Sequence, residues 1–195
     1  MYSLKDMIKK LFNHFFALFL VLNLNSVWAE SSCKFDQCGI NVEFRGEYLE
    51  ETCEIDIDGS GNKGTITLPT ISVKSLDADS SEAGATPFSV SLNNCPYNRK
   101  VALYFRKGSA GMDARTGNLL NSQGDNYSWN VQVRLRKEDG SLIFIDDLNT
   151  MQRYNIPASG DVVKHTFMAS YYANGNKKVT AGEIQTQSEI DLVYE

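Results

Sequence analysis

Histidine is scarce in this sequence, and the cysteine spacing offers no metal site. Only two of the 195 residues are histidines, and His165 is the only one beyond the first thirty residues. The four cysteines form no C-x-x-C pair and lie far from His165 in sequence, which argues against zinc. Residues 56–61 resemble the start of a calcium loop, but Thr67 stands where a bidentate glutamate is needed. We therefore expect no metal and no cofactor.

The residue sets of known catalytic sites are missing as well. We find no serine elbow, no cysteine–histidine pairing and no convincing pair of carboxylates. His165 lies within an alternating apolar segment, 162–172, where a lone histidine is typical of packing. We therefore predict that the chain is not an enzyme.

Basic residues form no patch or arginine-rich helix. The formal net charge of the whole chain is −5. Beyond residue 29 it is −7, because Lys5, Lys9 and Lys10 with Asp6 contribute a net +2 before that point. This charge argues against binding to nucleic acid.

The hydrophobic stretch at the start is too short for a membrane span. It covers residues 15–24 and is interrupted by Asn23, whereas a transmembrane helix needs about 20 apolar residues. Lysines precede it, and Val27 and Ala29 suit the −3 and −1 positions of a cleavage site. We expect residues 1–29 to be a signal peptide. The remaining 166 residues fit one domain.

All four cysteines follow the predicted signal peptide. An even number of cysteines in an exported chain indicates disulfides, and four cysteines allow three connectivities. The cysteines are Cys33, Cys38, Cys53 and Cys95.

Apolar and polar residues alternate along most of the chain. Such alternation indicates antiparallel strands with one face on a core, and turn residues separate the runs. Asp139 and Gly140 stand between two runs and predict a hairpin. We therefore expect a β-sandwich of immunoglobulin type. The predicted strands fall near residues 42–48, 53–57, 66–68, 71–73, 88–92, 101–105, 129–135, 142–145, 163–171 and 184–194.

Three sequence features resemble chaperone–usher fimbrial subunits, the type 1/P-like pilin family. Residues 42–47 (VEFRGE) run into Cys53, as the first strand of these subunits does. Residues 84–95 are similar to the family segment that carries the second cysteine of the domain disulfide. Tyr194 is penultimate and Gly182 is fourteenth from the end, which resembles the family's terminal assembly strand.

The resemblance implies a fold and a set of site residues. The fold would be all-β, an incomplete immunoglobulin-like sandwich (42–195) that a donor strand completes. It implies a Cys53–Cys95 disulfide. The N-terminal extension, residues 30–41, would be the donor, with Cys33, Phe35 and Gly39 entering a neighbour's groove. The groove and assembly strand would contain Gly182, Ile184, Ile190, Leu192 and Tyr194.

The resemblance also implies a function and partners. The chain would be a structural, minor subunit of a fimbria that supports cell adhesion and polymerises by donor-strand complementation and exchange. Its partners would be a periplasmic pilus chaperone, an outer-membrane usher and neighbouring subunits. It would be exported through the periplasm to the cell surface. The alternative is a free-standing secreted β-sandwich that binds carbohydrate or protein.

Cys33 and Cys38 decide whether the extension can act as a donor. An extended strand separates Cα atoms five residues apart by about 16 Å. A disulfide needs roughly 4.4–6.8 Å. The two states exclude each other. A bonded pair would place the subunit at the tip of the fibre, and a reduced pair would allow an internal or basal position.

Overall fold

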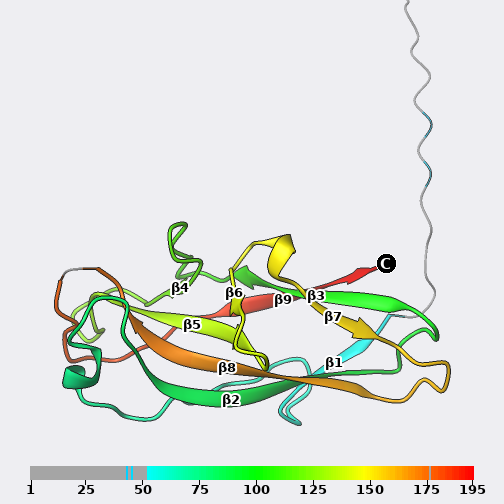
Figure 1. Ribbon diagram of the computed structural model, residues 1–195, viewed down its shortest axis with the longest axis horizontal. Helices are drawn as coiled ribbons and strands as arrows, with labels where there is room; N and C mark the ends of the chain where they lie inside the picture. The colour runs from blue at the N-terminus through cyan, green and yellow to red at the C-terminus, as the bar shows by residue number, and fades with distance from the viewer. Residues whose placement is uncertain (1–42, 44, 46–51, 176) are drawn as a thin grey trace, which may run out of the picture. The chain divides into compact units, whose positions relative to one another are not determined.

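A computed structural model describes residues 43, 45, 52–175 and 177–195 (Figure 1). The chain divides into two compact units, Met1–Glu47 and Tyr48–Glu195. In the first unit the exposed side chains of Arg45 and Glu43 form an ion pair at 3.0 Å. The predicted signal peptide (1–29) and extension (30–41) lie outside the described residues, as does most of the strand predicted at 42–48.

The second unit consists of two antiparallel sheets, so the all-β sandwich predicted from alternation is confirmed. The six-stranded sheet has the order β1–β2–β8–β5–β4, with β6 paired to β5, and the three-stranded sheet has the order β7–β3–β9 (Figure 1). Two 3-10 helices, η1 (Val73–Leu76) and η2 (Leu148–Thr150), lie between strands. Within the described ranges, no helix has the length and apolar character that a membrane crossing requires. The strands are β1 (Glu54–Ile57), β2 (Glu82–Asn93), β3 (Lys100–Lys107), β4 (Leu119–Leu120), β5 (Val131–Lys137), β6 (Leu142–Ile143), β7 (Gln152–Asn155), β8 (Val163–Ala173) and β9 (Ser188–Tyr194).

The inward faces of the two sheets share one hydrophobic core. Phe88, Phe105 and Phe167 come from β2, β3 and β8, and their ring centroids lie 5.4–6.3 Å apart. These rings are at most 6% exposed. Burying such a side chain contributes about 1.5–3 kcal/mol relative to leaving it in water. Because a one-residue slip would turn these rings to solvent, the core fixes the face that each strand presents.

The strands predicted near residues 66–68, 71–73 and 129–135 differ from the structure. Ile66 and Leu68 pack on the core, but their segment pairs with no strand in the described part of the chain, and Val73 begins η1. β5 begins at Val131 rather than at Trp129, which is 52% exposed. The backbone N–H of Trp129 donates to the hydroxyl of Thr180 at 2.8 Å, outside the β5 ladder.

The hairpin predicted at residues 139–140 is confirmed. It joins β5 to β6, and the N–H of Lys137 donates to the carbonyl of Ser141 at 2.9 Å.

Charged side chains join three strands of the larger sheet. Glu82 in β2 accepts hydrogen bonds from Arg134 and Arg136 in β5, each at 2.6 Å, and from Ser170 in β8 at 3.2 Å. Burial alone raises the pKa of Glu82. The hydrogen bonds and charges of Arg136 and Arg134 outweigh it and hold the pKa below its ordinary value of 4.5. Arg134 also lies over the ring of Tyr172, 3.7 Å from the centroid. The cluster therefore ties β2 to β5 across β8.

Candidate functional site

β9 is the terminal strand of the three-stranded sheet, and among the described strands it pairs only with β3. We call its other side the free edge. In the β3–β9 register, Leu192 lies opposite Leu103 and Ile190 lies opposite Phe105. Because opposite residues point to the same face, the side chains of Ile190 and Leu192 point inward with the core. Tyr194 follows the same parity, opposite Val101.

The backbone groups of β9 divide between its two sides by parity. The N–H of Glu195 donates to the carbonyl of Lys100 at 2.9 Å, and the carbonyl of Gln187 accepts from the N–H of Gly108 at 3.1 Å. Odd-numbered residues of β9 therefore direct their backbone groups toward β3, because hydrogen-bonded pairs alternate in an antiparallel ladder. The backbone groups of the even-numbered residues face the free edge. These residues are Ser188, Ile190, Leu192 and Tyr194.

The inward side chains of β9 remain partly exposed. Leu103 and Phe105 on β3 are 0% and 4% exposed, whereas Ile190 and Leu192 opposite them are only half-buried. The four residues pack in the same core cluster. Apolar side chains that contact a core but stay accessible, beside unpaired backbone groups, form a surface that another strand can cover.

The segment before β9 corrects the predicted extent of the assembly strand. The resemblance implied an assembly strand from Gly182 to Tyr194, but β9 begins at Ser188. Gly182 and Ile184 precede the strand. Their segment is held by other contacts: the carbonyl of Glu183 accepts from the N–H of Ser128 at 2.9 Å. The segment before Ser188 thus pairs with residues near 128 instead of with β3. The β3–β9 ladder therefore does not continue into this segment.

Gly182 has a packing role in that segment. A Cβ atom at Gly182 would lie 2.5 Å from the backbone nitrogen of Ser128, so only glycine allows this approach. Ile184 is half-buried and packs against both hydrophobic clusters. Both residues therefore position the start of β9.

Residues 62–71 form a second segment that pairs with no described strand, although the sequence predicted a strand in this region. Within the described residues, no backbone–backbone hydrogen bond involves residues 62–71. Ile66 and Leu68 are half-buried and pack on the core, while Thr65 and Thr67 between them are exposed. The carbonyl of Pro69 accepts from the hydroxyl of Tyr171 at 3.2 Å. The segment thus has the alternation of a strand without a strand partner.

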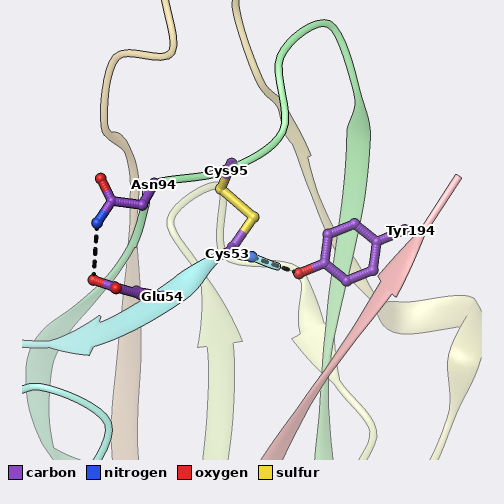
Figure 2. Close-up of a disulfide and its surroundings, with 5 residues drawn as sticks. All are labelled: Cys53, Glu54, Asn94, Cys95 and Tyr194. Atoms are coloured by element: carbon purple, nitrogen blue, oxygen red, sulfur yellow. Dashed lines mark hydrogen bonds between the residues drawn. A yellow bond between two sulfur atoms is a disulfide. The ribbon is translucent and has the colours of Figure 1, made fainter. Parts of the chain in front are cut away.

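Tyr194 joins the end of β9 to the start of β1. Its hydroxyl accepts a hydrogen bond from the backbone N–H of Cys53 at 2.7 Å (Figure 2). Cys53 is bonded to Cys95, as the resemblance implies, with a Cα–Cα distance of 4.1 Å. The side-chain amide of Asn94 donates to the carboxylate of Glu54 at 3.0 Å. The sequence pattern marked Tyr194 as part of the assembly strand, but nothing in it indicated this contact.

The outer face of β9 carries charged side chains beside the exposed Val193. Asp191 accepts from the hydroxyl of Tyr104 at 3.2 Å and from Arg106 at 3.1 Å. Partial burial, and then the hydrogen bond to Asp191, raise the pKa of Tyr104. The hydrogen bond to Asp191 also raises the pKa of Arg106. β9 therefore presents charge on one face and apolar side chains on the other.

The remaining candidate residues fall into two groups. Cys33, Phe35, Cys38 and Gly39 lie outside the described residues. His165 faces the sandwich interior, with its ring edge-on to that of Tyr154 at 4.5 Å, and burial lowers its pKa. Among the described residues, no group of three or more His, Cys, Asp or Glu side chains could hold a metal ion. The chemistry available at the free edge is backbone hydrogen bonding and apolar contact.

Comparison with known proteins assigns the family. The family model "Fimbrial protein" matches residues 42–195. The major fimbrial subunit SMF-1 of Stenotrophomonas maltophilia is 28% identical over 158 residues, which cover 78% of this chain and 90% of the relative. The F17 fimbrial protein of Escherichia coli is 30% identical over 161 residues, covering 79% and 86%.

The fold is also that of solved pilus subunits. A subunit from the structure of a chaperone–usher pilus aligns with a TM-score of 0.56 and 15% identity, covering 84% of this chain and 99% of that one. Because the family match spans the sandwich and the relatives are covered over most of their length, the chain belongs to the fimbrial protein family and is an exported subunit of a cell-surface fimbria.

Proposed function

We propose that the free edge of β9 binds an extended strand and that the subunit assembles through it. A periplasmic chaperone supplies this strand first. The N-terminal segment of a neighbouring subunit then replaces it, which is donor-strand complementation followed by exchange. The observation that carries the proposal is that Ile190 and Leu192 are half-buried beside backbone groups that pair with no strand in the described part of the chain.

The free edge of β9 and residues 62–71 give the incoming strand its contacts. Its backbone would bond to the even-numbered residues of β9, and its apolar side chains would cover Ile190 and Leu192. Residues 62–71 supply a second set of backbone groups, which make no backbone–backbone hydrogen bond within the described part of the chain. Each hydrogen bond contributes about 0.5–1.5 kcal/mol net, and buried apolar area adds about 25 cal/mol per Å².

The proposal extends to the route of assembly. Residues 1–29 act as the signal peptide, and an outer-membrane usher receives the chaperone-bound subunit. The fimbria supports adhesion of the cell. The minor rank of the subunit and the donor role of residues 30–41 remain predictions from the sequence.

Two aspartate substitutions on β9 test the proposal. Leu192→Asp places a charge on the inward face, where burying it costs several kcal/mol, so complex formation should fall sharply. Val193→Asp is the matched control, since Val193 is adjacent and 39% exposed on the outer face. Each variant is co-expressed with the fimbrial chaperone, and the amount of chaperone that co-purifies is measured.

The pair of variants separates binding from folding. Circular dichroism of each purified protein, measured with the same donor peptide added, shows whether the sandwich forms. If Leu192→Asp retained as much chaperone as Val193→Asp, the free edge would not be the binding surface. A wild-type chain that stays folded and monomeric without any added strand would favour the free-standing binding module instead.

A further inference from the structure

Two large apolar side chains are exposed on adjoining loops at one end of the sandwich. Tyr97, in the β2–β3 connection, is 62% exposed, and Val162, in the β7–β8 connection, is 60% exposed. The two connections are joined where the N–H of Ile156 donates to the carbonyl of Arg99 at 2.8 Å. We call this the Tyr97–Val162 surface.

Tyr97 is exposed but held in place. A Cβ atom at Gly160 would lie 2.2 Å from a ring carbon of Tyr97, so the ring rests directly on the backbone of that glycine. The β7–β8 turn under it is closed by a bond from the N–H of Gly160 to the carbonyl of Pro157 at 3.1 Å. Ser159 donates to the carboxylate of Asp161 at 2.6 Å in the same turn. A fixed aromatic ring loses little entropy on binding, which is typical of an interface anchor.

The path of the chain indicates what covers this surface. The second unit's first strand starts directly after Cys53, and Cys53 is bonded to Cys95, two residues before Tyr97. The N-terminal segment therefore joins the sandwich at the end that carries Tyr97. A neighbour that holds residues 30–41 is tethered to this end by the chain between residues 41 and 53.

The length of the tether favours a neighbour at this end. Twelve residues span at most about 43 Å when fully extended. β2 has twelve residues, which correspond to about 40 Å along the sandwich. To reach a neighbour at the opposite end, the tether would have to be fully extended along the whole domain. To reach a neighbour beside Tyr97, it would not have to be extended.

We propose that the Tyr97–Val162 surface packs against the neighbouring fimbrial subunit that takes up this chain's N-terminal segment. This inference rests on the proposed function, because it assumes that the segment is donated. The surface adds a second contact between the two sandwiches and restrains their relative orientation.

Hydroxyl-radical footprinting of the wild-type chain tests the contact without altering the fold. The chaperone-bound subunit and the assembled fimbria are labelled in parallel and compared by mass spectrometry. Labelling of Tyr97 should fall at least fivefold on assembly. Leu148 is the control, because it is 54% exposed in η2, and its labelling should not change. Equal labelling of Tyr97 in both states would overturn the inference.

Matched serine variants test the strength of the contact. Pairs of subunits carrying Tyr97→Ser should dissociate about tenfold faster than wild-type pairs, and Leu148→Ser pairs should not. Uptake of a donor peptide at the free edge should be unchanged in both variants. If the wild type took up no strand, the proposed function would fail. If it took up the strand but Tyr97→Ser pairs dissociated normally, only this inference would fail. Normal assembly of Tyr97→Ser with lost binding to cells or sugars would assign the surface to a receptor instead.

Discussion

The disulfide between Cys53 and Cys95 should make a large contribution to the stability of the sandwich. It closes a loop with a sequence separation of 42 residues. In the chain-entropy model, a loop of this length stabilises the folded state by about 4 kcal/mol. For a unit the size of Tyr48–Glu195, each kcal/mol shifts the melting temperature by about 2–4 °C. Reduction should therefore lower the melting temperature by roughly 8–16 °C.

The measurement needs a chain in which only this disulfide can form. Cys33→Ser and Cys38→Ser remove the other two thiols, and thermal unfolding is followed by circular dichroism with and without reductant. All samples contain the same donor peptide, itself with serine at positions 33 and 38, since bound ligand shifts the apparent stability.

A second variant controls for the reductant. With Cys53→Ala and Cys95→Ala added, reductant should change nothing. A fall of less than about 3 °C on reduction of the disulfide-containing chain would refute the loop-closure argument.

Three further predictions concern the edge, the charged cluster and the donor. Tyr194→Phe removes the acceptor for the Cys53 N–H and should cost about 1 kcal/mol in urea unfolding, so an unchanged midpoint would contradict this role. The pKa of Glu82 is lowered, so its ion pairs stabilise the fold above about pH 4.5 and this stability is lost as the pH falls further. The stability lost in Glu82→Gln should therefore shrink in acid, and a pH-independent loss would exclude the ion pairs as its cause. A peptide of residues 30–44 should bind at the free edge when Cys33 and Cys38 are reduced but not when they are bonded to each other. Equal binding of both forms would contradict the argument that the disulfide prevents donation.

Alternation was sufficient to predict the strands that carry the core. It placed Phe88, Phe105 and Phe167 on strands and gave β9 its inward residues, because a period of two identifies a face without tertiary information. It could not tell which strand lies at an edge. Ile66 and Leu68 alternate as well as Leu192 does, yet no strand partner for them is present in the described part of the chain.

The contacts made by single side chains could not be predicted from the sequence. The bond between the hydroxyl of Tyr194 and the N–H of Cys53 joins residues 141 positions apart, and its formation depends on how the two sheets pack. The fixed position of the Tyr97 ring depends on the close approach of Gly160 from another loop. The start of β9 at Ser188 depends on residues near 128 that hold the preceding segment.

Hydrogen exchange at the individual amides of β9 tests most directly whether the free edge binds a strand. Exchange is followed by NMR on the chain with and without the donor peptide. The amides of Ile190 and Leu192 should slow at least tenfold more than those of Asp191 and Val193, which already face β3. Equal slowing in the two sets would contradict strand addition at the free edge.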